Sequence, residues 1–337
     1  MERGDFMSEF KFGCVPSEVD HRDYVYKQIV APVTLPVRYN RERECSPVRS
    51  QGDWGTCVGF AGAGIKDWQE RKNYKRDMVM SPLFLYKQCK QLDGKPDQEG
   101  TDLRTVMKVL KDYGICKEET LPYENIIMDK PTWPKVLPPC KGQIDAAKEY
   151  VIKTYARLYS LEDIKQAILQ SGPVLAGIFL CENFRKCNGY IFMPEGGILG
   201  AHAVVITGWD DSLVYPYPNK TRKGFLRIRN SWGQIWGESG YAWMPYDYYY
   251  EKLDIGTPYF FESWSSVDVI VPVSAKEIIL WLNEKKALID GTETTLDQAP
   301  VLDKNTNRTL VPLRFIGENM GYTVEYTSGK ITMRKRI

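Results

Sequence analysis

The spacing of hydrophobic residues changes near Gly172 from a helical repeat to a strand-like alternation. Before this point apolar residues recur every three or four positions, which is typical of amphipathic helices. The expected helices begin at Cys57 and span Ser81–Lys90, Thr101–Tyr113 and Leu161–Ser171. After it, alternate residues are apolar, which predicts strands at Val174–Leu180, His202–Trp209, Gly224–Asn230 and Gly240–Met244. Helices first and strands second predict an α+β domain with two segregated halves and a cleft between them.

The two ends of the chain differ from this central region. The start is rich in charge and Pro, with short extended-looking pieces around Tyr24–Tyr26 and Val33–Val37. The pattern of apolar and polar residues changes again at Ser263–Ser274, where we place a domain boundary. The residues after it predict short strands and one helix near Phe315–Met320. We therefore expect an N-terminal arm or short pro-segment at 1–48, a main domain at 49–266 and a small β-rich module at 275–337.

Composition narrows the function classes. The 337 residues are 43% hydrophobic and 26% charged, as in a folded protein rather than a disordered one. A formal net charge of +2 gives no electrostatic case for a nucleic-acid partner. The longest mainly apolar run, Gly172–Cys181, is far shorter than the roughly 20 residues that span a bilayer. We expect no membrane span, and the N-terminus carries no signal-peptide pattern.

Histidine is scarce, which narrows the chemistry further. The chain has eight Cys but only two His, His21 on the arm and His202 in the main domain. A metal site built from several imidazoles is therefore nearly excluded, and a reaction that needs a base at neutral pH has few candidates. We expect no metal and no organic cofactor.

Three residues form a candidate catalytic set. Cys57 lies where a Gly-containing loop meets a helix N-terminus, whose partial positive charge favours a thiolate. His202 begins one predicted strand and Asn230 ends another. A Cys–His pair with an amide that orients the imidazole is an arrangement used for acyl transfer. Each residue alone has an ordinary interpretation, as a buried thiol, a strand histidine or a turn former, and the combination favours catalysis.

The segments around these residues resemble a known family. Gln51–Ala61 (QGDWGTCVGFA) is similar to the nucleophile segment of papain-like cysteine peptidases, Ala201–Val204 to their histidine segment and Asn230–Tyr241 to their asparagine segment. His202 follows Cys57 at a separation within the roughly 130–150 residues of papain-like signatures. The resemblance implies a two-lobed α+β fold with a helical left half and a β-barrel-like right half.

The resemblance also implies roles for neighbouring residues. Gln51 would supply the side-chain amide of an oxyanion hole, together with the backbone N–H of Cys57, and Trp232 would shield the Asn–His hydrogen bond from water. The implied substrate-binding positions are Gly100 on the cleft wall and Gly177 and Ala201 at the main pocket. Such small residues predict a roomy apolar pocket.

The chain departs from the family pattern in several places. Trp54 and Gln98 stand where the family has the two cysteines of a disulfide, and Val58 replaces the usual aromatic residue. The long inhibitory propeptide is missing, and we hypothesise that residues 1–45 wrap the domain or partly occupy the cleft. Seven cysteines other than the candidate nucleophile remain. Cys89–Cys140 is the first disulfide to consider among them, although all seven could equally be reduced.

The last part of the chain, Ile278–Ile337, has a resemblance of its own. Asn307–Ile316, followed by Gly321–Val324 and Lys330–Met333, is similar to the stalk module named after the N-terminal region of copper amine oxidases. That module occurs widely in bacterial surface and secreted proteins. The segment contains no His and no Cys, so ordinary copper ligation is not expected. A binding or spacer role, with a cell-surface or protein partner through residues 275–337, is the better interpretation.

Together these features predict a cysteine-type endopeptidase. It would hydrolyse peptide bonds of protein or peptide substrates through Cys57, His202 and Asn230 and a thioester acyl-enzyme. Two alternatives stay open: a peptide ligase or transpeptidase that uses the same triad, and a surface-attached binding protein whose peptidase domain is idle. The module favours a secreted or surface location, whereas the missing signal-peptide pattern leaves the cytoplasm open.

Overall fold

A computed structural model describes residues 11–20, 22–126, 135–217, 220–267, 278–289, 292–304, 308–327 and 330–335. The chain forms two compact units. Unit 1 comprises Met1–Glu18 and Thr34–Asp268, and unit 2 comprises Val19–Val33 and Val269–Ile337. Each unit is described by itself.

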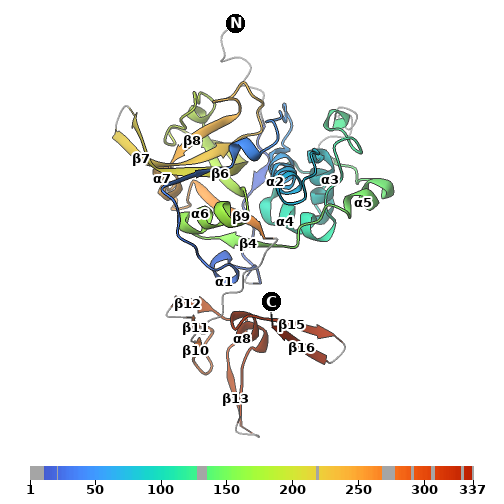
Figure 1. The fold of residues 1–337 in the computed structure, drawn as a ribbon, viewed down its shortest axis with the longest axis vertical. Coiled ribbons are helices and arrows are strands. Elements are labelled where there is room, and N and C mark those ends of the chain that lie inside the picture. Colours follow the sequence, from blue (N-terminus) through green and yellow to red (C-terminus); the bar gives the residue numbers. More distant parts are fainter. Residues whose placement is uncertain are drawn as a thin grey trace. The chain divides into compact units, whose positions relative to one another are not determined.

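Helices gather on one side of unit 1 (Figure 1). They are α2 (Cys57–Asn73), α3 (Pro82–Leu92), α4 (Leu103–Asp112) and α5 (Lys141–Ala147). The start of α3 is fixed by the Ser81 side chain, which accepts a hydrogen bond from the N–H of Phe84, and by Pro82 in the first turn. The helices predicted from Cys57 and at Ser81–Lys90 are confirmed, whereas α5 was not anticipated.

Helix α4 begins later than the sequence predicts. Thr101–Asp102 form the short strand β3, and the Asp102 side chain then caps the helix by accepting the N–H of Thr105. The strand forms because the backbone of Cys14–Val15, strand β1, pairs with it in parallel. A contact between segments far apart in sequence therefore sets this boundary.

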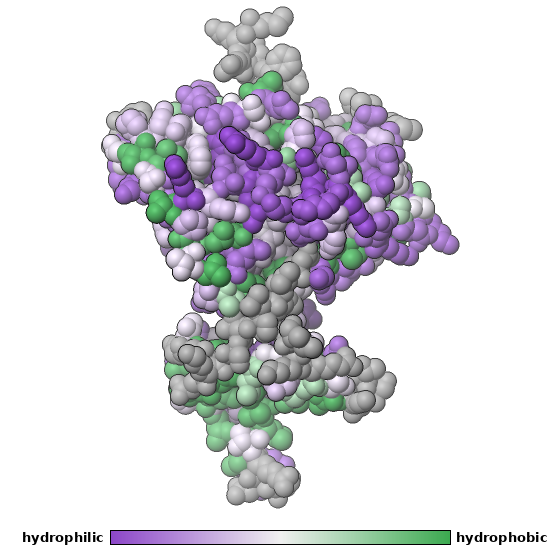
Figure 2. Space-filling model, in the orientation of Figure 1, coloured by the Kyte–Doolittle hydropathy of each residue, from purple (hydrophilic) through white to green (hydrophobic). Residues whose placement is uncertain are grey.

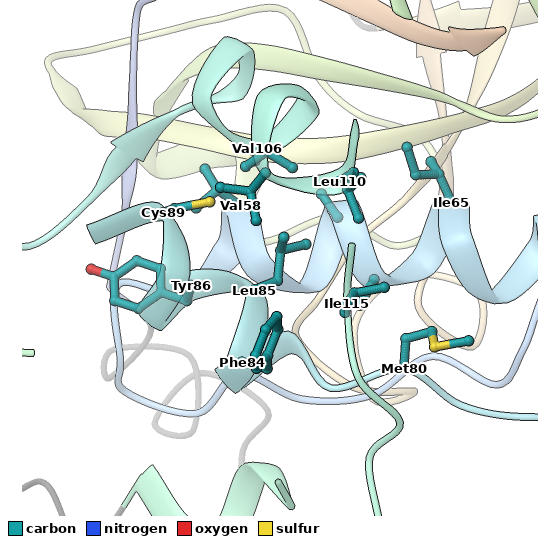
Figure 3. Close-up of a cluster of buried hydrophobic side chains, with 14 of the residues drawn as sticks. Val58, Ile65, Met80, Phe84, Leu85, Tyr86, Cys89, Val106, Leu110 and Ile115 are labelled. Atoms are coloured by element: carbon teal, nitrogen blue, oxygen red, sulfur yellow. The ribbon is translucent and has the colours of Figure 1, made fainter. Parts of the chain in front are cut away.

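A fully buried hydrophobic cluster joins three of these helices (Figure 3). Its members include Val58, Ile65, Leu85, Val106 and Leu110. Gly59 lets α2 approach α3 closely, because an added Cβ would lie 2.5 Å from the carbonyl oxygen of Pro82. This packing fixes the end of α2 that carries Cys57.

A seven-stranded sheet forms the other side of unit 1 (Figure 1). Its strands are β4 (Thr154–Leu158), β5 (Val174–Cys181), β6 (Ile198–Tyr217), β7 (Lys220–Arg229), β8 (Tyr241–Pro245) and β9 (Phe260–Val267), in the order β4-β9-β5-β6-β7-β8, with β2 (Arg38–Asn40) paired to β6. All pairs are antiparallel. Helices α6 (Leu161–Gln170) and α7 (Tyr246–Tyr250) accompany the sheet.

The predicted strands after Gly172 and the helix at Leu161–Ser171 are confirmed, but other expectations are wrong. The piece expected to be extended around Tyr24–Tyr26 is extended at Val25, and the helical turn α1 (Tyr26–Ile29) begins at its last residue. The piece expected at Val33–Val37 lies further along, at Arg38–Asn40, where it pairs with β6. Strand β9 was missed. Its sequence falls where we expected a domain boundary, and pairing with both β4 and β5 places it inside the sheet.

Unit 2 is built from short antiparallel pairs. Strands β10 (Ile278–Leu280), β11 (Lys286–Ile289) and β12 (Thr292–Thr295) form one sheet, β13 (Val301–Asp303) pairs with β14 (Arg308–Leu310), and β15 (Tyr322–Thr327) pairs with β16 (Lys330–Lys335). Helix α8 (Leu313–Asn319) confirms the predicted helix and packs on β15. Hydrophobic residues gather on the visible surface of this unit, whereas hydrophilic residues cover much of unit 1 (Figure 2).

Two further expectations concern cysteines and membranes. All eight cysteines are free thiols, so the suggested Cys89–Cys140 disulfide is wrong; Cys89 is buried under the helices, whereas Cys140 is exposed. Among the described residues, no helix combines the length and apolar character needed to cross a membrane.

Candidate functional site

Cys57 is the first residue of α2 and has no exposed surface. Helix N-termini present backbone N–H groups without intrahelical acceptors, which favour a negative charge. Burial has the larger effect in this structure and raises the pKa of the Cys57 thiol to about 11, although backbone hydrogen bonds with Ala203, Gly13 and Val58 lower it. The thiol is therefore uncharged at neutral pH in this arrangement.

His202 and Asn230 form a buried pair on neighbouring strands. Nε2 of His202 lies 2.8 Å from Oδ1 of Asn230, and the same oxygen accepts the N–H of Ser231 at 2.8 Å. The ring of Trp232 lies 5.0 Å from the imidazole, between centroids, and is fully buried, so it keeps water from the pair. Nδ1 of His202 has no hydrogen-bond partner among the described residues, so it is the nitrogen left to exchange a proton.

Burial also sets the charge of the imidazole. It lowers the pKa of His202 to about 4, against the hydrogen bond to Asn230, which raises it. Cys57 and His202 are thus both neutral here, because neither is solvated. The thiolate–imidazolium pair expected from the sequence is therefore not the form that these pKa values favour in this structure.

The Gln51 side chain is held in place from both sides. Its Nε2 donates to the carbonyl oxygen of Trp54 at 2.7 Å and to that of Lys11 at 3.0 Å, while its Oε1 accepts the hydroxyl of Ser231 at 2.6 Å. The backbone N–H of Gln51 also donates to the carbonyl of Ser231. Ser231 was not singled out from the sequence; its position next to Asn230 was the available signal.

The N-terminal segment Lys11–Ser17, which we call the strap, lies across this site. The carbonyl of Lys11 accepts a hydrogen bond from the side-chain amide of Gln51. The centroid of the Phe12 ring lies 6.2 Å from the ring centroids of both His202 and Trp232. Strand β1 of the strap pairs with β3. Of the two arrangements expected for the N-terminal arm, the structure places this part of it in the cleft.

Gly13 is the point at which the strap passes closest to the nucleophile loop. A Cβ at Gly13 would lie 1.8 Å from the carbonyl oxygen of Gly55. No other residue fits without moving backbone. The strap therefore depends on glycine here.

Gly100, the residue expected on the cleft wall, and the next residue, Thr101, have different backbone partners. The N–H of Gly100 donates to the Tyr86 hydroxyl and its carbonyl accepts Nζ of Lys90, so both backbone groups are occupied inside the lobe. The N–H of the next residue, Thr101, donates to the carbonyl of Gly13 in the strap. Thr101 is thus the wall residue that meets an extended chain.

The residues expected to form the main pocket lie on neighbouring strands, next to a carboxylate. Sheet register places Ala203, Gly177 and Glu262 opposite one another on three neighbouring strands, and a Cβ at Gly177 would lie 2.4 Å from the ring of Phe261. Ala201 pairs with Phe179 further along the same strands. Glu262, which lies in none of the recognised motifs, adds a carboxylate to this row.

Two other expectations fall outside this geometry. His21 lies outside the described residues. Within the described ranges, no group of three or more His, Cys, Asp or Glu side chains could hold a metal ion.

Comparison with family models gives two matches. Residues 31–257 match the model described as papain family cysteine protease, and residues 250–334 match the copper amine oxidase N-terminal domain. Both resemblances drawn from the sequence motifs are confirmed.

Relatives and solved structures agree with the first match. The chain is 31% identical over 215 residues to the uncharacterized peptidase C1-like protein L477 of Acanthamoeba polyphaga mimivirus (59% of this chain, 64% of that protein), and 29% identical over 217 residues to cathepsin J of Mus musculus (62% and 60%). The alignments thus span less than two thirds of either relative.

Among solved structures, xylellain, a cysteine protease from Xylella fastidiosa, superposes with a TM-score of 0.63 at 27% identity, covering 77% of this chain and 97% of that one. The cysteine protease and lectin-like domains of Cwp84, a surface layer associated protein of Clostridium difficile, give 0.57 at 19% identity, covering 78% and 56%, a likeness of fold alone. The predicted α+β papain-like fold is confirmed.

Proposed function

Because the chain belongs to the papain family of cysteine proteases, we propose that unit 1 is an endopeptidase with Cys57 as nucleophile, His202 as general acid and base, and Asn230 as the residue that orients the imidazole. The observation that carries this proposal is the buried 2.8 Å contact between His202 and Asn230. It leaves Nδ1 as the free proton-exchanging atom, while Gln51 Nε2 already binds a carbonyl oxygen in the same site.

The reaction begins when a substrate carbonyl replaces that of Lys11. Cys57 gives its proton to His202, the sulfur attacks the carbonyl carbon, and the charge on oxygen is received by the Gln51 amide and the Cys57 N–H. His202 then protonates the leaving amine as the C–N bond breaks, which leaves a thioester on Cys57. Water gives a proton to His202 and attacks the thioester, releasing the acid and restoring the thiol.

The folded chain described here is the latent form of this proposed enzyme. The Lys11 carbonyl of the strap accepts the hydrogen bond of the Gln51 amide, which is the proposed oxyanion donor. The strap also excludes water from Cys57 and His202, and this burial keeps both side chains neutral. A substrate must therefore displace the strap before the thiolate can form. This proposal makes the N-terminal strap the element that controls access to the site.

The strap also runs in a direction that protects it from cleavage. His202 must protonate the leaving amine, so the part of a substrate beyond the scissile bond lies on the His202 side. In the strap, Phe12 lies beside His202, whereas Cys14, two residues later, pairs with Thr101 further along the wall. The chain direction is thus opposite to that of a substrate.

The two alternatives make different predictions for the acyl-enzyme. A ligase or transpeptidase forms the same thioester but transfers it to an amine, so the ratio of ligated to hydrolysed product with added amine separates the two. An idle peptidase domain would not need Gln51, His202 and Asn230 in bonding positions. The His202–Asn230 contact and the hydrogen bond from Ser231 to Gln51 favour activity. Protein or peptide substrates are therefore the proposed partners of unit 1.

Labelling with a thiol-directed epoxide tests the proposed nucleophile. We expect stoichiometric modification at Cys57, identified by peptide mapping because the chain has seven other cysteines. Cys57→Ala should lose the label, and Cys140→Ala, which removes an exposed thiol, should keep it. A wild-type protein that takes no label at Cys57 would favour a binding protein with an idle domain.

For unit 2 we propose a spacer or binding role toward a cell-surface or protein partner. Several large apolar side chains of this unit are exposed, among them Leu282, Leu302, Leu310, Met320 and Tyr326. Since its described residues hold no cluster of metal ligands, the copper in the name of the module gives no function here.

A further inference from the structure

The nucleophile loop, residues 51–56, connects the two proposed oxyanion donors. Gln51 is its first residue, and Thr56 is its last, immediately before Cys57 at the start of α2. The side-chain amide of Gln51 and the backbone N–H of Cys57 can bind one oxygen only if the two ends of the loop keep a fixed separation. Oxyanion donors act within about 2.7–3.1 Å of the oxygen, so a small change in the loop is enough to misplace them.

One hydroxyl group from outside the loop joins its two ends. The Tyr123 hydroxyl donates to the backbone carbonyl of Gln51 at 2.7 Å, and it lies 2.7 Å from Oγ1 of Thr56. Because a carbonyl oxygen can only accept, the phenol proton goes to Gln51, and the Thr56 hydroxyl donates to the phenol oxygen. Tyr123 therefore bridges the first and the last residue of the nucleophile loop.

The Thr56 side chain bonds to Tyr123 instead of capping α2. Thr56 is the N-cap residue of this helix, a position where threonine commonly accepts a backbone N–H of the first turn, but its side chain makes no such bond. Thr56 and Gln51 are both fully buried. Without the Tyr123 hydroxyl, two buried polar groups would each lose a hydrogen bond, which is costly enough to move the loop.

Tyr123 is itself held by contacts outside the nucleophile loop. Its backbone N–H donates to Oε1 of Glu118 at 2.7 Å, and Oε2 of Glu118 accepts a hydrogen bond from Arg49 at 3.1 Å. Its ring packs edge-on against Phe60 of α2, with 4.5 Å between the centroids. Burial raises the pKa of the Tyr123 phenol, so the hydroxyl keeps its proton at neutral pH and remains a donor.

We propose that Tyr123 is a positioning residue of the oxyanion hole, which sets the separation between the Gln51 amide and the Cys57 N–H. This inference rests on the proposed peptidase function. Tyr123 acts through Gln51 and Thr56 rather than by touching a reacting atom. Because charge develops on the substrate oxygen only as the tetrahedral intermediate forms, a misplaced donor lowers kcat and leaves KM nearly unchanged.

Tyr123→Phe in the full-length chain tests the proposal, because it removes the bridging hydroxyl and keeps the ring. For a peptide substrate we expect kcat to fall roughly 10–100-fold, with KM within about twofold of the wild type. Alkylation of Cys57 by iodoacetamide should keep its rate, because the sulfur attacks a saturated carbon, iodide leaves and no oxyanion forms. Both reactions require the strap to leave, so comparing them removes the fraction of open molecules.

Three further variants complete the comparison. Thr56→Val removes the other hydroxyl of the bridge and should also lower kcat, whereas Thr56→Ser, which keeps a hydroxyl, should restore most of that loss. Tyr250→Phe, at a residue of α7 that is 66% exposed, is the matched control and should leave kcat and KM unchanged. If Tyr123→Phe fails to fold, equal kcat values for Thr56→Val and Thr56→Ser overturn the proposal.

The outcomes separate this inference from the proposed function. If Tyr123→Phe cleaves as fast as the wild type, or if its alkylation slows by the same factor as its cleavage, Tyr123 does not position the oxyanion donors, and the peptidase proposal stands. A wild type that neither cleaves peptides nor takes the epoxide label at Cys57 overturns the peptidase function, and the role of Tyr123 with it.

Discussion

Two ionisable groups of the site, Cys57 and His202, are both held in their neutral forms by burial. The pKa of the thiol is raised and that of the imidazole is lowered, so both shifts oppose the ion pair that catalysis needs. Charge separation between them requires water or a substrate dipole in place of the strap. In the proposed latent form, the absence of water around Cys57 and His202 therefore keeps both side chains uncharged.

The His202 shift predicts a loss of stability in acid. Because its pKa is lower in the folded chain than in the unfolded one, the unfolded chain binds the proton first as pH falls. The contribution is complete above about pH 6.5 and is lost as pH falls through about 4. Urea unfolding should show that the wild type loses on the order of 3 kcal/mol more than His202→Gln between pH 7 and pH 4. Parallel losses in both proteins would contradict the buried neutral imidazole.

Individual residues differ in how far the sequence reveals them. Gln51, Cys57, His202 and Asn230 lie in motifs whose spacing carries a chemical meaning. In the structure His202 contacts Asn230, Gln51 bonds to Ser231, and Cys57 lies beside the backbone of Ala203. Ser17 and Glu262 lie in no such motif, because a glutamate on a strand and a serine on an arm are ordinary surface residues by pattern. Only the pairing of β9 with β5 and the path of the strap place them in the cleft.

Among the elements, helix α2 links the core to the nucleophile. Two glycines of α2 lie where the helix packs against α3. A Cβ at Gly62 would lie 2.5 Å from the Leu85 side chain, and a Cβ at Gly59 would meet the backbone of Pro82. The contact at Gly59 is the less forgiving, since backbone cannot rotate away as a side chain can. Cys57 is thus positioned by how closely α2 and α3 approach.

Gly59→Ala should therefore destabilise unit 1 in spite of the higher helix propensity of alanine. We expect a loss of about 1–3 kcal/mol in the free energy of unfolding, as for other overpacked cores, and slower epoxide labelling of Cys57. Gly142→Ala is the control, because a Cβ there meets nothing within 4 Å. Equal or greater stability of Gly59→Ala in thermal unfolding would show that the two helices can separate freely.

Element boundaries follow local signals where the chain itself supplies the hydrogen bonds. Ser81 and Pro82 fix α3, and that helix begins as predicted. Strands β3 and β9 could not be anticipated in this way, because their partners, β1 and β5, are remote in sequence.

For the whole molecule, the proposed latent form makes the strap an inhibitor that belongs to the same compact unit as the site it covers. The strap belongs to the N-terminal eighteen residues that form one compact unit with the papain-like domain. Three contacts keep the strap in place: the close approach of the Gly13 backbone to Gly55, the hydrogen bond from Gln51 to the Lys11 carbonyl, and the hydrogen bond from the Ser17 N–H to Glu262. Weakening one of these contacts should open the site without altering the catalytic residues.

Gly13→Val in the full-length chain makes that change. The new side chain cannot fit at 1.8 Å from the Gly55 carbonyl, so we expect the strap to leave the site. The pKa of Cys57, about 11 in the closed form, should then fall toward or below the ordinary value near 8.5. Alkylation of Cys57 at pH 7, followed by peptide mapping, should be about a hundredfold faster or more. Gly142→Val serves as the matched control, and equal rates for all three proteins would mean that the strap does not protect the thiol.

Peptide-library cleavage tests the central claim, that Cys57, His202 and Asn230 of this chain form a peptidase site. Wild type, Gly13→Val and Cys57→Ala are incubated with the library from pH 5 to pH 8, and products are identified by mass spectrometry. The account predicts cleavage by the wild type, more cleavage by Gly13→Val and none by Cys57→Ala. A wild type and a Gly13→Val variant that both cut nothing over the whole pH range, or a Cys57→Ala variant that cuts as well as they do, would contradict it.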